Sequence, residues 1–270
     1  MPLTVTFDTG DLADVVSPET SQAPTDPADA ARVRAAIQLG EIQGVFCETL
    51  ITLEGIKNVD RSAVFGSTSL NARYRHETAP DGNGITYIDT RAEQPARRAL
   101  DQRQADRFSA AFALRMKLLA VFPRIARGKV DDPDGNRYII PDEAELVQCL
   151  ERQYAMLSAI EARGLGCAQA RQIALEIQTE VGGHSNFLFY LGRPRNPTEQ
   201  EKINRAIAEW SDGDSIAAHY GYRIDLFCSR DFGQNAGKAS VLHPDNRQWL
   251  SDTFGIRFVT LAALAEMVTA

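Results

Sequence analysis

The sequence has few cysteines and no long apolar run. Its four cysteines are scattered, with no CxxC pair and no histidine at zinc-ligand spacing: Cys47, Cys149, Cys167 and Cys228. We therefore expect free, buried thiols in a reducing cytoplasm. No stretch reaches the roughly 18 uninterrupted apolar residues of a membrane span. The first residues also lack the basic and apolar regions of a signal peptide. These absences predict a cytoplasmic protein with no membrane partner.

Several catalytic and nucleotide-binding signatures are also missing. The chain has no P-loop, no G-x-G-x-x-G and no G-x-S-x-G, so neither dinucleotide binding nor serine-hydrolase chemistry has support. Positive charge is in deficit, with 29 Lys and Arg against 36 Asp and Glu and a net charge of −7. That balance argues against a chain that binds nucleic acid through its overall charge. It leaves room for a local basic surface or an acidic metal site.

The most informative stretch that is present lies at the N-terminus. An apolar, β-branched run over residues 3–7 ends on Asp8, and Gly10 follows as a turn former. This pattern is typical of a buried strand that carries an acid to the end of a parallel sheet. A second short apolar run over 44–47 leads into a helix that begins near Glu48.

The rest of the chain alternates strand and helix at both ends and is helical between them. The periodicity predicts strands at 223–228 and 256–259 and helices at 29–39, 95–122, 141–162, 168–180, 198–210, 214–219, 244–253 and 261–268. A short strand is expected at 85–88. The alternation predicts an α/β fold with a parallel sheet flanked by helices. Its core is expected from residues 1–60 and 198–270, interrupted by a mainly helical insertion at 61–197.

Four acidic segments follow one another along this pattern: VTFDTG, ETLITLEGI, SDGDSIAAH and LFCSRDFG. Their order and their strand–helix setting resemble those of the PIN-domain ribonucleases, a family that includes bacterial toxin nucleases. The resemblance covers about residues 1–60 and 198–270. It implies a PIN-like parallel sheet and hydrolysis of RNA that leaves a 5′-phosphate and a 3′-hydroxyl.

The resemblance also implies which acids are catalytic and hold metal: Asp8, Glu54, Asp214 and Asp231. Asp8 ends the first strand, Glu54 lies in the helix after the second, and Asp214 starts a later helix. Asp212 is expected to be an auxiliary metal ligand. Glu48 is the alternative to Glu54 if the register differs, and Ser229 is a weaker candidate for positioning the site.

The chemistry of clustered carboxylates agrees with that expectation. Carboxylates brought together repel one another and raise one another's pKa unless a cation neutralises them. Hard oxygen ligands suit Mg²⁺ or Mn²⁺, which we expect as the cofactor. One or two such ions polarise a phosphodiester, activate a water and stabilise the leaving oxygen, so no nucleophilic side chain is needed.

Each acid also has an ordinary alternative role. Asp8 fits an Asx-turn or a helix N-cap, and Asp214 fits an N-cap. Glu54 fits an acid on a solvated helix face, and Asp231 fits an ordinary residue of the loop that follows its strand. The triplet at residues 8–10 also spells the aspartic-protease DTG. That interpretation requires an all-β chain with a second triplet or a small dimeric unit, whereas this chain is mostly helical after residue 28.

A local basic segment lies within the predicted insertion. Residues 91–129 contain ten basic and three acidic residues, a local charge of +7. We expect five of them to follow the RNA backbone: Arg97, Arg98, Arg103, Arg107 and Lys117. The alternative is a solvated helix face with salt bridges.

The expected function is a divalent-metal-dependent endoribonuclease with RNA as substrate. A homo-oligomer is left open, and an antitoxin partner is not assumed. Two rivals remain: a PIN-like module that binds or assembles without cutting, and a small-molecule or phosphate-ester hydrolase that uses the same acids.

Overall fold

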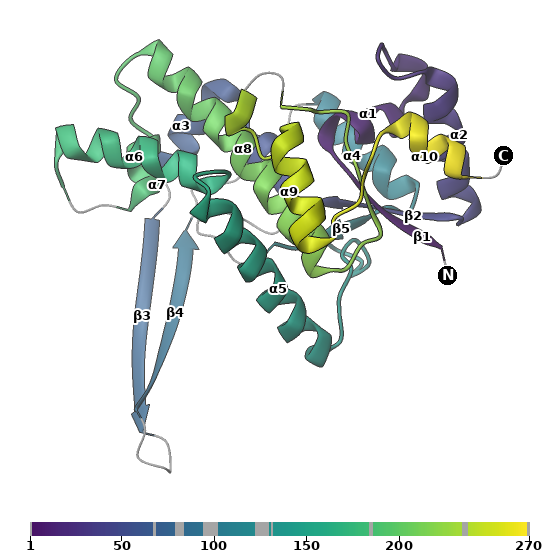
Figure 1. The fold of residues 1–270 in the computed structure, drawn as a ribbon. Coiled ribbons are helices and arrows are strands. Elements are labelled where there is room, and N and C mark those ends of the chain that lie inside the picture. Colours follow the sequence, from purple (N-terminus) through teal and green to yellow (C-terminus); the bar gives the residue numbers. More distant parts are fainter. Residues whose placement is uncertain are drawn as a thin grey trace.

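The computed structural model describes residues 2–66, 69–78, 84–93, 102–121, 130, 132–183, 186–233 and 237–268. Its centre is a five-stranded sheet in which every pairing is parallel, in the order β5-β2-β1-β6-β7 (Figure 1). The strands are β1 Leu3–Phe7, β2 Ile42–Cys47, β5 Lys117–Leu119, β6 Leu226–Cys228 and β7 Phe258–Val259. Helices flank this sheet, which confirms the predicted α/β class.

β1 is the middle strand of the sheet and is buried on both faces at its C-terminal end. Val5 and Phe7 on one face and Thr6 on the other are fully buried, as expected for a strand covered on both sides. β1 pairs with β2 on one side, where Leu3 lies opposite Ile42. On the other side it pairs with β6, where Phe7 lies opposite Cys228. The chain therefore extends the sheet in both directions from β1, which makes the β1–β6 boundary a topological switch point.

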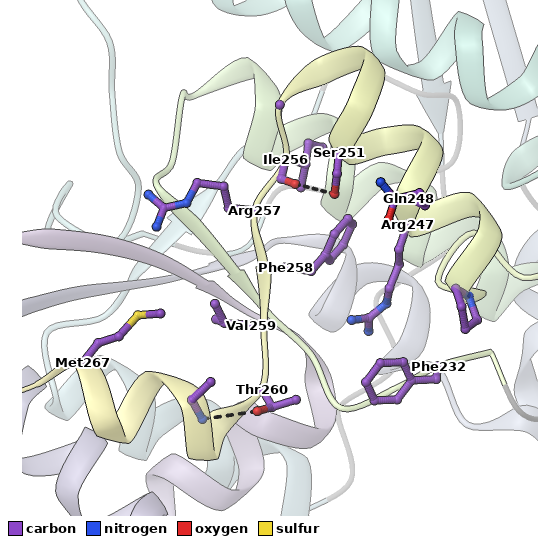
Figure 2. A pocket seen from close by; sticks show the side chains of 13 residues that line it. Phe232, Arg247, Gln248, Ser251, Ile256, Arg257, Phe258, Val259, Thr260 and Met267 are labelled. Atoms are coloured by element: carbon purple, nitrogen blue, oxygen red, sulfur yellow. Dashed lines mark hydrogen bonds between the residues drawn. The ribbon is translucent and has the colours of Figure 1, made fainter.

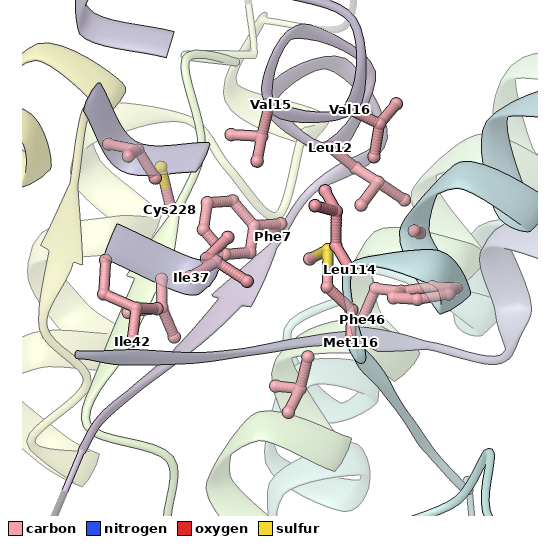
Figure 3. Packing of buried hydrophobic residues seen from close by; sticks show 14 of the residues in the cluster. Phe7, Leu12, Val15, Val16, Ile37, Ile42, Phe46, Leu114, Met116 and Cys228 are labelled. Carbon is pink, nitrogen blue, oxygen red and sulfur yellow. The ribbon is translucent and has the colours of Figure 1, made fainter. Parts of the chain in front are cut away.

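One apolar core lies between the sheet and four helices: α1 Thr9–Val16, α2 Pro27–Leu39, α4 Gln102–Ala113 and α10 Leu261–Met267. Figure 3 shows Phe7 and Phe46 from the sheet among helix residues such as Leu12 and Val15. The ring of Phe46 stacks on that of Phe108 at 5.8 Å between centroids. Each such fully buried side chain contributes about 1.5–3 kcal/mol.

A long helix, α8, organises the second part of the molecule. The helices in this part are α3 Asn58–Gly66, α5 Glu143–Ala162, α6 Cys167–Val181, α7 Phe187–Leu191, α8 Pro197–Gly221 and α9 Pro244–Phe254. α8 packs against α5 and α6 and also contacts β2. The side chain of Asn196 caps α8 by accepting a hydrogen bond from Glu199 N at 2.9 Å. Trp210 on α8 is buried among residues of α6 and α7.

α8 differs from the sequence-based expectation, which placed two helices at 198–210 and 214–219. The structure has one continuous helix, so Asp214 lies inside it and not at its start. The polar segment around Gly213 remains helical because its surroundings are tightly packed. A Cβ on Gly213 would lie 3.4 Å from the Cα of Gly166. Tertiary packing here overrides weak helix propensity.

The helix predicted over 95–122 is also wrong in its second half. α4 ends at Ala113, Arg115 has a φ of 61°, and Lys117–Leu119 forms β5 beside β2. The apolar run after Arg115 suits a helix or a buried strand equally well. Residues 95–101 and 122 lie outside the described part of the chain.

The predicted insertion at 61–197 contributes to the sheet and also carries a hairpin. β5 belongs to this range. β3 Ser69–Thr78 and β4 Gly84–Glu93 form a separate antiparallel sheet that projects from the body (Figure 1). The strand expected at 85–88 lies within β4.

The sequence also predicts buried cysteines without disulfides and no membrane-spanning helix. All four cysteines are buried and none is in a disulfide, as the sequence predicts. Among the described residues, no helix has both the length and the apolar character needed to cross a membrane.

Candidate active site at the ends of β1 and β6

The site begins where β1 and β6 end side by side. Asp8 directly follows β1 and caps α1, and its Oδ1 accepts a hydrogen bond from Thr9 N at 2.7 Å. Ser229 directly follows β6 and donates from Oγ to Asp8 Oδ2 at 2.8 Å. Both oxygens of Asp8 are therefore held by donors. This is the switch point, the place where open parallel sheets bind ligands.

Glu54 reaches the same place from the segment after β2. It ends a short π-helix, Leu50–Glu54, and its Oε2 accepts a hydrogen bond from Thr9 Oγ1 at 2.5 Å. Thr9 thus donates to Asp8 through its backbone and to Glu54 through its hydroxyl. Short π-helical segments are frequent at functional sites.

Glu48, the alternative to Glu54, has a different role. It accepts hydrogen bonds from Val121 N at 2.9 Å and from the Tyr138 hydroxyl at 3.0 Å. These contacts tie the end of β2 to the segment after β5. Glu48 therefore stabilises the sheet, and Glu54 is the glutamate beside Asp8.

Two further carboxylates complete what we call the acidic cluster, which is Asp8, Glu54, Asp212 and Asp231. Burial raises the pKa of Asp212 well above its usual range, and the charges of Asp8, Glu54, Glu209 and Asp231 add to the rise. The charge of Asp231 also raises the pKa of Asp8. Asp231 is exposed, so the cluster is open to solvent on that side.

The pKa values show that the cluster is crowded with negative charge. Burial raises the pKa of Glu54 to about 7, and the neighbouring Asp8 charge adds to the rise, while the hydroxyls of Thr9 and Ser211 oppose it. Burial also raises the pKa of Asp8, against hydrogen bonds from Ser229 and Thr9. Glu54 therefore retains its proton in part near neutral pH, and a bound cation would favour its ionised form.

Asp214 lies on the same helix as Asp212 but two residues later, or about 200° around the helix axis. It is fully buried. Burial raises the pKa of the Cys47 thiol to about 12, and the charge of nearby Asp214 adds to that rise. Asp214 therefore lies beside the end of β2. Of the two aspartates, Asp212 is the one whose pKa is raised by the charges of Asp8, Glu54 and Asp231.

Two arginines flank the cluster and bond to backbone carbonyls. Arg247 is buried; it donates from Nε to Leu242 O at 3.0 Å and from an Nη atom to Ser229 O at 3.2 Å and to Asp231 O. Its charge lowers the pKa of Asp8. Arg61 donates to Ile56 O at 3.1 Å and Asn204 O at 3.0 Å.

The two arginines act on the cluster through their charge and not through an ion pair. Among the salt bridges of the described residues, none joins Lys or Arg to a carboxylate of the acidic cluster. This leaves its negative charge available to a cation.

The donor atoms suit a hard divalent cation. Four carboxylates and the hydroxyls of Thr9 and Ser229 offer only oxygen, the ligand that Mg²⁺ and Mn²⁺ prefer. Within the described ranges, no three His, Cys, Asp or Glu side chains are already grouped as a metal-binding set. The carboxylates of the acidic cluster would therefore have to approach one another to share an ion.

Three of the five basic residues that we expect to follow the RNA backbone belong to the described part of the chain. Arg103 is exposed and Arg107 half-buried on α4, which packs against α1. Lys117 lies in β5 and its Nζ donates to Asn136 O. Arg97 and Arg98 lie outside the described residues. The described members therefore do not share one helix face.

Sequence reasoning missed Arg247 and Glu209. Glu209 accepts a hydrogen bond from Val241 N at 2.9 Å, and burial raises its pKa. Neither residue stands in a recognisable motif, and both reach the site only through the packing of α8 and α9.

The chain matches no protein-family model, no curated protein and no solved structure. The resemblance to PIN-domain ribonucleases therefore stays a prediction.

Proposed function

We propose that this protein is a divalent-metal-dependent nuclease that hydrolyses phosphodiester bonds in RNA. One observation carries the proposal. Thr9 and Ser229 donate hydrogen bonds to Asp8 and Glu54 at the switch point, and burial together with neighbouring negative charge raises the pKa of Asp8, Glu54 and Asp212. Such a cluster binds a cation favourably, because the cation removes the repulsion.

The residues have distinct roles in this proposal. Asp8, Glu54, Asp212 and Asp231 hold Mg²⁺ or Mn²⁺, which when bound polarises the phosphodiester and lowers the pKa of a water. Thr9 and Ser229 orient the carboxylates through the hydrogen bonds described above. Arg247 holds the carbonyls of Ser229 and Asp231, and so fixes the segment that follows β6.

RNA is the proposed partner, and the cytoplasm the proposed location. Four buried thiols outside any disulfide suit a reducing compartment. The basic residues of α4, the helix that packs against α1, are the proposed contacts to the phosphates of the RNA backbone.

The test is cleavage of a mixed pool of labelled RNAs by the purified protein with Mg²⁺, with Mn²⁺ and with EDTA. We expect cutting that requires metal and is lost in Asp8→Asn. Asp252→Asn is the matched control, because Asp252 is exposed on α9 and only accepts a hydrogen bond from Gln248. Full metal-dependent cleavage by Asp8→Asn, or no cleavage by the folded wild type, would contradict the proposal.

A binding module that does not cut is the second candidate. It is favoured by the absence, in the described residues, of a ready-made metal-binding set. A folded protein that binds RNA but leaves it intact with every metal would establish this alternative.

A further inference from the structure

A groove with a volume of about 980 Å³ lies at the outer edge of the sheet, between α9, β7 and α10. Figure 2 shows Phe232 and Arg247 at one end of it and Met267 on the opposite helix. Its walls are mostly apolar and include Phe232, Ile256, Phe258, Val259 and Met267. Two of them remain exposed to solvent, Phe232 by 40% and Met267 by 52%.

Arg247 connects this groove to the acidic cluster. Its guanidinium carbon lies 4.5 Å from the ring centroid of Phe232 and 4.8 Å from that of Phe258. The same guanidinium donates to the carbonyls of Ser229 and Asp231. Phe232 itself directly follows Asp231. The aromatic end of the groove therefore begins one residue from a carboxylate of the acidic cluster.

The charge of the groove is opposite to that of the whole chain. Its lining contains two arginines, Arg247 and Arg257, and no acidic residue, whereas the chain carries a net charge of −7. An aromatic, apolar wall with positive charge suits a flat apolar group attached to an anion. A nucleotide has this composition, with a base for the ring and a phosphate for Arg257, the arginine that is exposed.

We propose that the groove holds an unpaired base of single-stranded RNA whose adjacent phosphate lies at the acidic cluster. This inference rests on the proposed nuclease function and adds its substrate class. The exposed ring of Phe232 stacks against the base, and Arg257 faces the backbone. Stacking on an aromatic ring tolerates any base, so the groove selects single strands and not a sequence. A duplex keeps its bases stacked inside and cannot present one to Phe232.

Binding is measured by fluorescence anisotropy with Ca²⁺ in place of Mg²⁺ or Mn²⁺, so that a cation meets the phosphate at the acidic cluster, and gel analysis of the same samples checks that no strand is cut. The probes are a labelled single-stranded oligoadenylate, an abasic strand of the same length and a duplex. We expect the wild type to bind the oligoadenylate about 5- to 100-fold more tightly than the abasic strand. Phe232→Ala is expected to bring that ratio close to one, while Phe232→Tyr keeps it.

Two controls separate stacking from general apolar contact. Phe232→Leu keeps an apolar side chain without a ring and is expected to behave like Phe232→Ala. Tyr154→Ala removes an aromatic side chain that is 63% exposed on α5, outside the groove, and is expected to leave the ratio unchanged.

The outcomes distinguish this inference from the proposed function. Equal affinity of the wild type for the oligoadenylate and the abasic strand overturns the inference, even if the protein cuts RNA. The same holds if Phe232→Ala keeps the preference. A base preference that depends on Phe232, in a protein that cuts no RNA with any metal, supports the groove and overturns the nuclease.

Discussion

The Ser229 hydroxyl donates a 2.8 Å hydrogen bond to Oδ2 of Asp8, and so joins residues 221 positions apart in the sequence. Each residue directly follows a strand, and the two strands are neighbours in the sheet. The bond therefore depends on the correct pairing of β1 with β6. It also lowers the pKa of Asp8 against the effect of burial.

Ser229→Ala tests that bond. Losing a donor to the ionised form raises the pKa of Asp8 further, so the acid limb of the pH–rate profile moves to higher pH. A hydrogen bond to a charged group is worth about 1.5–3 kcal/mol, which predicts a shift of roughly one to two pH units. Metal-dependent cleavage measured across pH checks this. Thr179→Val, which removes an exposed hydroxyl on α6, is the control, and an unmoved acid limb in Ser229→Ala contradicts the prediction.

Glu54→Gln is expected to stabilise the protein while removing its activity. The folded state holds a proton on Glu54 up to a pKa of about 7, against an ordinary value of 4.5. Between pH 4.5 and pH 7, Glu54 is ionised in the unfolded chain but protonated in the folded protein. The free energy of unfolding of the wild type therefore falls as the pH rises through this range. We expect Glu54→Gln to gain about 1–3 kcal/mol at pH 8 without metal and little at pH 4. Urea unfolding at both pH values measures this, and equal differences would argue against a raised pKa of Glu54 in the folded state.

Divalent metal is expected to stabilise the wild type in a pH-dependent way. A cation binds the ionised carboxylates, so the gain is large above pH 7 and small near pH 5, where Glu54 is protonated. At a metal concentration of 100 times Kd, the gain is about 2.7 kcal/mol. Thermal unfolding with MgCl₂ checks this, with NaCl of equal ionic strength as control. A similar gain in Asp212→Asn would exclude Asp212 from the metal site.

His219 is expected to make the fold sensitive to acid. Burial lowers the pKa of His219 to about 3, and its Nδ1 shares a 2.9 Å hydrogen bond with the Thr6 hydroxyl. Because the unfolded chain takes up a proton near pH 6.5, stability is lost as pH falls from there toward 3.

His219→Gln keeps a polar partner for Thr6 without a group that titrates in this range. Relative to this variant, the wild type is expected to lose about 2 kcal/mol between pH 7 and pH 5. Urea unfolding at the two pH values measures the difference. Parallel losses in both proteins would show that His219 is not the acid-sensitive group.

Gly192→Ala is expected to destabilise the fold strongly. A Cβ on Gly192 would lie 2.1 Å from the Cα of Gly66, so α3 and the end of α7 would have to separate. We expect a loss of about 3 kcal/mol or more in urea unfolding. Gly255→Ala is the comparison, because that position has a φ of +73° but open space around it. It is expected to lose only about 1 kcal/mol. Equal losses would refute the close approach.

The parts of the site next to strands were predictable from the sequence. The apolar run before Asp8 and the one before Ser229 each mark where a buried strand ends. The carboxyl ends of parallel strands share one edge of a sheet, so these positions were expected to converge. Glu54 was preferred over Glu48 from the family pattern, and the structure has Glu54 beside Asp8.

The parts that depend on packing were not predictable. Whether Asp212 or Asp214 joins the cluster depends on the rotation of α8, and that follows from its unbroken course through Gly213. Sequence periodicity gave no sign of this continuity, because the segment is polar and contains glycine. Arg247 has no local signal either, since Phe232 and Phe258 surround it only after β7 has paired with β6.

The pairing of β1 with β6 also sets the order of events on the ribosome. At a synthesis rate of about 5–20 residues per second, roughly 10–40 s pass between the emergence of β1 and that of β6. During this interval the nascent chain has β1 and β2 but lacks Ser229 and Asp231, which complete the acidic cluster. The nuclease that we propose would therefore acquire its complete acidic cluster only when synthesis nears the end of its coding region.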